Sequence, residues 1–391
     1  MDVVKYIYLR WMIVIVIFTT SLLNIYAKKP ASSFNQIDSI VNDAMARKVF
    51  PGCQVLVVKD GVAVYDKCFG NLTYDIGHPV SATTMYDLAS LSKTTGTLFA
   101  IMKLYDSGKL QLTDKASKYL DFLKNTDKEN ITITDLLFHE SGLPAYISFG
   151  KKPVYTEQAE INKMAMQTIA RTPLQAKTYL YSCVNFMLLK EIAEAITRSS
   201  MDEFLNSTFY GPMGLKNTAY LPLNTHKIEQ IAPTIRGKSF QNGILQGIVH
   251  DPDAAYLGGV SGNAGLFATA SDVAAMYQLL LNNGEFNGNR YLCTETCRIF
   301  TTTVSKSGRR GLGFDKSVPT KPSSNPCCTA APKSVFGHTG YTGTCCWVDP
   351  ENKLIYVFLS NRTYPVDGEN KLAKMSIRPK IQQVIYNNIQ K

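Results

Sequence analysis

The feature that most constrains the fold is the occurrence of strong strand patterns near both ends of the chain. Residues 53–69 have the pattern of a β-hairpin, because apolar residues flank the turn signal Lys59-Asp60-Gly61. Residues 343–348 and 354–359 form two further apolar runs, joined by the turn at residues 349–352. Strands from both ends, with helices between them, predict a single sheet to which both ends contribute.

The spacing of apolar residues predicts the helices that accompany this sheet. Ile37, Ile40, Val41 and Ala44 mark one helix face, and further helices are predicted at about residues 90–107, 271–282 and 377–390. The fold class is therefore α/β, a mainly antiparallel sheet flanked by helices. We expect the α/β part to comprise about residues 36–110 and 251–391, with a mainly helical insertion at about residues 111–250.

Residues 1–27 have the composition of a secretory signal peptide. Lys5 and Arg10 precede an apolar stretch, and Ile25-Tyr26-Ala27 ends in a small residue. The alternative is an uncleaved anchor, because Trp11 to Ala27 could just span a bilayer. We expect residues 1–27 to be cleaved and residues 28–35 to be a linker. The protein is then periplasmic or otherwise extracytoplasmic, and it contacts the membrane only if the segment is retained.

Charge and cysteine content limit the partners and cofactors to expect. The net charge is +10, and it is +9 without residues 1–27. This suits anionic surroundings such as cell-envelope polymers, although a merely soluble basic surface explains it equally well. No basic run with interleaved aromatic residues occurs, so no nucleic-acid partner is expected. The nine cysteines lack metal-ligand spacing, so no metal site is expected, and most should be small buried residues.

The first motif with chemical content is Ser90-Leu91-Ser92-Lys93 at the start of a predicted helix. Lys93 lies one turn after Ser90, so both side chains share a helix face. The helix dipole would also stabilise negative charge that develops on the hydroxyl. The plain alternative is that Ser90 is only an N-cap. A second Ser-x-x-Lys, Ser148 to Lys151, lies in a Gly/Lys/Pro loop that imposes no such geometry.

Two further motifs complete the pattern. The segment Tyr179-Leu180-Tyr181-Ser182-Cys183-Val184-Asn185 precedes a predicted helix, and a tyrosine close to a lysine can act as a base. The glycine-rich segment Phe336-Gly337-His338-Thr339-Gly340-Tyr341-Thr342-Gly343 leads into a strand, where backbone can approach a ligand closely. Taken singly, a tyrosine beside a helix is far more often a half-buried packing residue, and the glycine-rich segment is more often only the entry to a strand.

In this order and spacing, the three motifs resemble the penicillin-recognising serine hydrolases. That superfamily contains class C β-lactamases, D,D-peptidases, D-aminopeptidases and related esterases, and the resemblance runs from about residue 35 to residue 390. The carrying segments are MYDLASLSKTTGTLFAIMKLYDSGKLQLTDKASKYL, ITITDLLFHESGLP, YLYSCVNFMLLKEIAEAIT and GHTGYTGTCCWVDPENKLIYVFLSNR. The His-x-Ser-Gly-Leu stretch in the second of these is interpreted as structural.

The resemblance implies a role for each matching residue. Ser90 would be the acylated nucleophile, and Lys93 and Tyr181 would share the proton transfers. The N–H groups of Ser90 and Tyr341 would form the oxyanion hole. The remaining substrate-binding or oxyanion positions would be Cys183 and the three residues His338, Thr339 and Gly340. These three lie in the strand where many members have Lys-Thr-Gly.

Two positions depart from the family pattern. Cys183 stands where the family often has an Asn that binds the substrate amide, and the frame from Tyr181 to Asn185 has the wrong spacing. His338 replaces a lysine, and neutral histidine binds carboxylate more weakly. Both changes are familiar in the esterase and aminopeptidase branches, and both argue against efficient β-lactamase activity. Lys93 can be a base only if its ammonium is destabilised.

The sequence thus predicts an exported serine hydrolase that forms an acyl-enzyme and needs no cofactor. The expected substrate is a small molecule or peptide with a peptide, ester or β-lactam carbonyl, including peptidoglycan-derived peptides. The alternative is a non-catalytic penicillin-binding or sensing module with the same fold. His78, His139, His226 and His250 are interpreted as structural or surface residues. Residues 258–265 are interpreted as a loop packed near the site.

Overall fold

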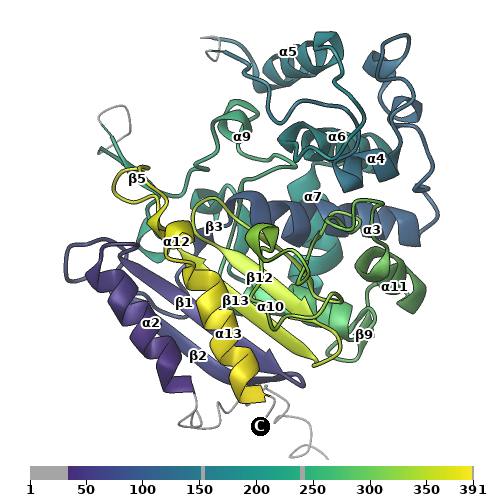
Figure 1. Cartoon of the computed structure of the whole chain (residues 1–391). Helices are drawn as coiled ribbons and strands as arrows, with labels where there is room; N and C mark the ends of the chain where they lie inside the picture. Colours follow the sequence, from purple (N-terminus) through teal and green to yellow (C-terminus); the bar gives the residue numbers. More distant parts are fainter. Residues whose placement is uncertain (1–33, 151–154, 238–242, 390–391) are drawn as a thin grey trace, which may run out of the picture.

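The largest sheet combines strands from both ends of the chain, as predicted. The computed structural model describes residues 34–150, 155–237 and 243–389. Its six-stranded antiparallel sheet has the order β10-β11-β12-β13-β1-β2. The strands are β1 (Gly52–Lys59), β2 (Val62–Gly70), β10 (Asp315–Lys316), β11 (Phe336–Thr339), β12 (Cys345–Asp349) and β13 (Leu354–Ser360). Figure 1 shows the early strands beside the late ones.

Helices cover both faces of this sheet, which explains why β1, β12 and β13 are mostly apolar. Val55 and Val57 of β1 pack in the cluster that contains α2 (Asn35–Ala46) and α13 (Ile377–Ile389). Leu56 points to the opposite face and packs in the cluster that contains α10 (Ala270–Leu281). Successive strand residues alternate between faces, so a strand buried on both sides needs apolar residues at every position. The α/β fold class is therefore confirmed.

The region between the sheet halves is mainly helical, and several helices follow the central helix α3 (Leu98–Asp106) in it (Figure 1). They are α4 (Ile133–Phe138), α5 (Gln158–Arg171), α6 (Cys183–Thr197), α7 (Met201–Leu205), α8 (Gly211–Met213) and α9 (Pro252–Tyr256). Later in the chain come α11 (Thr294–Thr302) and α12 (Lys371–Lys374). Predicted helix 271–282 agrees with α10 to within one residue.

Smaller sheets were not predicted. One has the order β3-β7-β4, formed by Tyr86–Asp87, Leu266–Ala268 and Thr218–Tyr220. Two hairpins pair β5 (Ile235–Arg236) with β6 (Ile244–Leu245), and β8 (Glu285–Phe286) with β9 (Asn289–Arg290). Strands of two or three residues are too short for an alternating pattern to be recognised. The β3 strand nevertheless matters, because it leads directly into the segment that carries Ser90.

The helix predicted at residues 90–107 is present, but its first turns are not α-helical. Ala89–Leu91 form a 3₁₀ turn, Lys93–Thr97 form a π turn, and regular α3 follows. Departures of this kind inside a helix often occur at functional sites, because they re-aim side chains. Apolar spacing predicts the helix as a whole and cannot resolve these turns.

Three other sequence predictions concern termini, membrane and cysteines. The predicted signal peptide and most of the linker lie outside the described residues. Within the described ranges, no helix is both long and apolar enough to cross a membrane. All nine cysteines are free thiols, and six of them are buried, as expected; the buried ones are Cys53, Cys297, Cys327, Cys328, Cys345 and Cys346.

Candidate active site

Ser90 and Lys93 are in direct contact at the start of the central helix. Lys93 Nζ donates a hydrogen bond to Ser90 Oγ at 3.0 Å and another to the carbonyl of Asn263 at 2.9 Å. Lys93 is fully buried, whereas Ser90 is partly exposed. Asn263 belongs to the glycine-rich loop at residues 258–265, so the prediction that this loop packs near the site is confirmed.

The backbone just before Ser90 is strained. Ala89 has φ of 48°, a left-handed conformation that residues with a side chain rarely adopt. Its N–H donates to Asp87 Oδ1 at 2.8 Å, and the other carboxylate oxygen accepts the N–H of His250 at 2.7 Å. Burial raises the pKa of Asp87 to about 6. Asp87 thus holds the turn that presents Ser90. The sequence does not reveal this role, because nothing in it marks the left-handed conformation of Ala89.

The tyrosine motif supplies the opposite wall. Lys93 Nζ lies 5.1 Å from the centre of the Tyr181 ring and 3.5 Å from Cys183 Sγ, at the first residue of α6. The His139 ring lies 4.7 Å from the Tyr181 ring, and His139 Nδ1 accepts the N–H of Ser182 at 3.0 Å. Tyr181 Oη is buried and has no partner among the described residues. His139 is structural, as predicted, and it positions Tyr181.

Asn185 has a structural role. Its Oδ1 accepts the hydroxyl of Ser141 at 2.6 Å, and its side-chain nitrogen lies 3.2 Å from His139 Nδ1. Asn185 is fully buried. It therefore ties α6 to the His-x-Ser-Gly-Leu stretch and does not face the nucleophile. This agrees with the expectation that the frame from Tyr181 to Asn185 has the wrong spacing.

The protonation state of Lys93 does not meet the condition for a lysine base, which is an ammonium that its surroundings destabilise. Burial lowers the pKa of Lys93, but Cys183 and Tyr181 beside it raise that pKa by more, so the net shift is upward. Burial also raises the pKa of Tyr181, and the positive charge of Lys93 opposes that shift only in part. At neutral pH the pair therefore holds a lysine ammonium and a neutral phenol. Lys93 in the free protein is not the destabilised ammonium that the sequence analysis required.

A buried arginine that the sequence analysis missed lies behind these residues. The Arg310 guanidinium carbon is 5.0 Å from the centre of the Tyr181 ring, and Arg310 Nη1 is 3.3 Å from Asp315 Oδ1. Only 2% of Arg310 is exposed. No motif points to it, because it lies far from all three motifs in the sequence. Its positive charge lowers the pKa of Tyr181, as the positive charge of Lys93 also does.

His338 lies in β11, with its ring 5.8 Å from that of Tyr181. Burial lowers the pKa of His338 well below its usual value, and the charges of Arg310 and Lys93 add to this effect. His338 is therefore neutral. Its Nδ1 lies 2.7 Å from the Thr339 carbonyl, which can only accept, so the ring proton is on Nδ1. The buried Nε2 is then an acceptor, and it has no partner among the described residues.

The loop after β11 docks on the backbone that precedes Ser90. Thr342 Oγ1 donates to the Asp87 carbonyl at 2.6 Å, and Thr344 Oγ1 donates to the Leu88 carbonyl at 2.9 Å. A Cβ at Gly340 would lie 2.2 Å from the Leu88 carbonyl oxygen, so only glycine fits there. This contact places the Tyr341 backbone beside the nucleophile segment.

Two further residues that the motifs did not identify hold Tyr341. The guanidinium carbon of Arg362 lies 4.3 Å from the centre of the Tyr341 ring, and Arg362 Nε donates to the Tyr341 carbonyl at 2.8 Å. The His250 ring stacks on Tyr341, with 5.8 Å between ring centres. His250 is therefore a structural residue next to the site.

This arrangement has the parts that acyl transfer by a serine hydrolase requires: a hydroxyl, a cation and a phenol in contact, and backbone close to the hydroxyl. Within the described residues, no group of three or more acidic, histidine or cysteine side chains is placed to hold a metal ion. The predicted residues Ser90, Lys93, Tyr181 and Cys183 are brought together around Lys93. His338 lies against Tyr181, and Thr339, Gly340 and Tyr341 continue from it.

Comparison with known proteins identifies the family. Residues 37–376 match the family described as Beta-lactamase, and the chain belongs to that family. Proteins of Escherichia coli K12 and O157:H7, both named "Putative D-alanyl-D-alanine carboxypeptidase", are 35% and 34% identical to it. The alignments cover 83% and 87% of this chain, and 82% and 85% of those relatives, respectively.

Solved structures share the fold. A class C beta-lactamase superposes with a TM-score of 0.70 at 20% identity, covering 91% of this chain and 97% of that protein. The hydrolase EstCE1 superposes with a TM-score of 0.70 at 19% identity, covering 90% and 98%. A penicillin-binding protein homologue from Caulobacter crescentus superposes with a TM-score of 0.69 at 18% identity, covering 91% of this chain and 98% of that protein. Family, relatives and fold together support a serine hydrolase of the β-lactamase type.

Proposed function

We propose that the protein is a D-alanyl-D-alanine carboxypeptidase that acts on peptidoglycan-derived peptides through an acyl-enzyme at Ser90. The observation that carries this proposal is the 3.0 Å contact between Lys93 Nζ and Ser90 Oγ, with Tyr181 against the same ammonium. Support for the substrate class comes from the relatives named D-alanyl-D-alanine carboxypeptidase, which align over more than four fifths of the chain.

The reaction divides into two displacement steps. Ser90 Oγ attacks the carbonyl of the penultimate D-alanine, the peptide C–N bond breaks, and terminal D-alanine leaves with a proton. Water then attacks the ester, and the serine hydroxyl is restored. The backbone N–H groups of Ser90 and Tyr341 stabilise the oxyanion in both steps.

Proton transfer falls to Tyr181, with Lys93 supplying charge. Because Lys93 is protonated in the free protein, it orients the Ser90 hydroxyl and lowers the cost of a negative charge on Tyr181. Tyr181, as phenolate, accepts the serine proton and delivers it to the leaving amine. Only the phenolate fraction is active, so the rate rises with pH until Tyr181 is ionised.

The substrate's carboxylate meets a neutral histidine at His338, which cannot supply the positive charge of the lysine found in many family members. This weakens binding of any substrate carboxylate, the terminal carboxylate of a D-Ala-D-Ala peptide included, whereas Cys183 lacks the amide that would pair with a β-lactam side chain. We therefore expect β-lactams to acylate the enzyme poorly relative to D-Ala-D-Ala peptides.

The test compares substrates on wild-type protein and on three variants. Wild-type protein should release D-alanine from a diacetyl-L-Lys-D-Ala-D-Ala peptide faster than it hydrolyses a chromogenic cephalosporin. Ser90→Ala should abolish release. Lys93→Ala and Tyr181→Phe should each lose several orders of magnitude, and the double variant should be no worse than the poorer single variant, because the residues act as one unit.

Ser148→Ala is the matched control, because it removes the serine of the second Ser-x-x-Lys in an exposed loop. It should leave turnover unchanged, and mass spectrometry of protein trapped with a penicillin should place the acyl group on Ser90. An adduct on any other residue would overturn the assignment. Covalent labelling of Ser90 without turnover of peptide or ester would instead support a non-catalytic penicillin-binding module.

Export forms part of the proposal. The basic start and apolar core of residues 1–27 support cleavage after Ala27 and a periplasmic or other extracytoplasmic location. N-terminal sequencing of protein from a cell-envelope fraction should then begin at Lys28. An intact Met1 on membrane-bound protein would show that the segment is retained as an anchor.

A further inference from the structure

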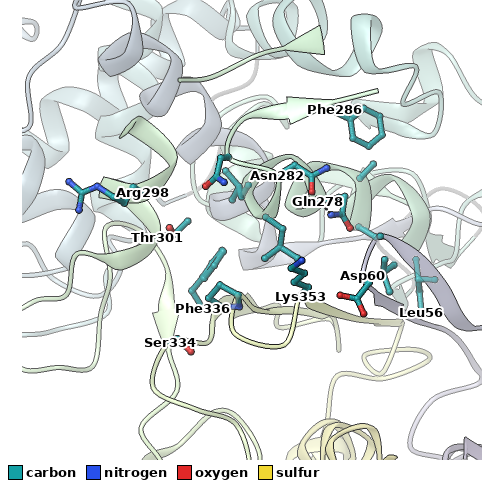
Figure 2. Close-up of a pocket in the computed structure, with 18 of the residues that line it drawn as sticks. Leu56, Asp60, Gln278, Asn282, Phe286, Arg298, Thr301, Ser334, Phe336 and Lys353 are labelled. Carbon is teal, nitrogen blue, oxygen red and sulfur yellow. Dashed lines mark hydrogen bonds between the residues drawn. The ribbon is translucent and has the colours of Figure 1, made fainter. Parts of the chain in front are cut away.

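A large cavity lies away from the catalytic residues, at the opposite end of β11 from Thr339. Its volume is about 1200 Å³, above the range common for sites that bind drug-sized molecules. Figure 2 shows Leu56 of β1, Phe336 of β11 and Gln278 of α10 around it. None of the catalytic or oxyanion residues proposed above lines this cavity.

The lining combines an apolar surface with a buried cation. Leu56, Phe286 and Phe336 supply apolar surface, and Lys316 of β10 lines the cavity with only 3% of its area exposed. Lys316 Nζ donates to the carbonyls of Thr301 and Ser334, at 3.0 and 3.1 Å. Both of these residues also line the cavity, so the ammonium lies at its wall.

Lys316 has no carboxylate partner among the described residues. Its neighbour in sequence, Asp315, points to the other face of the strand and pairs with Arg309 and Arg310. An ammonium has three N–H donors, and the two carbonyls occupy two of them. Burying an ammonium without a counter-ion is costly, and burial accordingly lowers the pKa of Lys316 to about 8. An anion at the third N–H would relieve this cost.

Other lining groups favour the same kind of ligand. Of the lining carboxylates, Asp60 pairs with Lys59, and Asp66, which lies opposite Leu56 in the sheet, is exposed to solvent. Two further cations, Arg298 and Lys353, also line the cavity. Lys333 adds an exposed positive charge without an ion pair among the described residues. Gln278 Oε1 is buried with no donor in the described part of the chain, so the cavity also offers an acceptor. The cavity therefore presents net positive charge beside apolar surface.

We propose that this cavity binds a small amphipathic carboxylate, with the carboxylate on Lys316 Nζ and the apolar chain against Leu56, Phe286 and Phe336. Carboxylate bound to a buried lysine makes a charge-assisted hydrogen bond, and the apolar chain gains from leaving water. This site is independent of the acyl-transfer site, so it can be occupied whether or not Ser90 is intact.

Isothermal titration calorimetry with octanoate tests the proposal. Octanoate should bind wild-type protein saturably with one-to-one stoichiometry, and octanamide, which lacks the charge, should bind at least tenfold more weakly. Ser90→Ala should bind octanoate as wild-type protein does. Lys316→Met should weaken octanoate at least tenfold, while Lys321→Met, an exposed lysine outside the cavity, should leave binding unchanged.

Lys316→Met should fold, because replacing a buried charge by an apolar side chain of similar size is often neutral or stabilising. If its circular dichroism or thermal melt shows otherwise, Ala275→Trp provides the second variant, since it fills the cavity without altering a charge. Ala275→Trp should abolish octanoate binding. The proposal is overturned if wild-type protein shows no saturable binding, if octanamide equals octanoate, or if the folded variants bind octanoate as wild-type protein does.

Discussion

Replacing Arg310 by methionine should show whether its charge tunes Tyr181. Methionine keeps most of the aliphatic bulk and removes the guanidinium that lies 5.0 Å from the Tyr181 ring. Because Arg310 lowers the pKa of Tyr181, its removal should raise that pKa. The active phenolate then becomes rarer at any given pH, so activity at neutral pH should fall.

The size of the effect follows from the distance. At 5.0 Å and an effective dielectric constant of about 20, a unit charge contributes about 3 kcal/mol to phenolate stability. Asp315 lies 3.3 Å from Arg310 and offsets part of this potential. We therefore expect the Tyr181 pKa to rise and kcat/KM at pH 7 to fall about 10- to 100-fold.

The assay is the pH profile of kcat/KM for D-alanine release between pH 5 and 10. Arg310→Met should move the rising limb to higher pH. Asp315→Asn removes the opposing charge and keeps Arg310, so it should move the same limb to lower pH. If both variants fold and the limb stays in place, or if both shift in the same direction, electrostatic tuning of Tyr181 by Arg310 is refuted.

Three other variants test individual contacts. Cys183→Asn should raise β-lactam acylation relative to ester hydrolysis, measured as the ratio of the two second-order rate constants, because an amide can pair with the substrate amide. Gly340→Ala should lower D-alanine release at least 100-fold, since its Cβ would lie 2.2 Å from the Leu88 carbonyl oxygen; Gly368→Ala, with no heavy atom within 4 Å, is the matched control. Below about pH 6, wild-type kcat/KM should show an additional acid limb, steeper than the dependence on Tyr181 ionisation alone, because protonation of Asp87 weakens its hold on the turn before Ser90. Asp87→Asn, which cannot titrate, should be less active at pH 7 and lack this acid limb.

For each of these three predictions, a specific result would contradict it. An unchanged rate ratio in folded Cys183→Asn would remove Cys183 from substrate recognition. Equal activity of the Gly340 and Gly368 variants would contradict the tight docking of the loop after β11. An acid limb that persists in Asp87→Asn would have to arise from another group.

Much of the fold follows from local patterns in the sequence. The strands β1, β12 and β13 are strong apolar runs, because both of their faces are covered, and such runs stand out from their surroundings. The helices α10 and α13 were likewise predicted to within about one residue at either end. The three-stranded sheet β3-β7-β4 was missed, because its strands are too short to show a period.

The parts of the site that were missed share a physical cause. Arg310 and Asp87 act through contacts between residues that are distant in the sequence, such as the 5.0 Å approach of Arg310 to Tyr181. The left-handed turn at Ala89 cannot be recognised from the sequence either, because alanine is common in ordinary helices. Neither kind of information is present in residue spacing.

The sequence by itself determined the contact between the proposed nucleophile Ser90 and Lys93, because the two residues are one helical turn apart and their contact is local. Only the tertiary structure decided the charge state of the site. Cys183 and Tyr181 outweigh the effect of burial and keep Lys93 protonated, and burial, together with the charges of Arg310 and Lys93, keeps His338 neutral. A pKa depends on every charge within a few ångströms and on exclusion of water, and both arise only when the chain has folded.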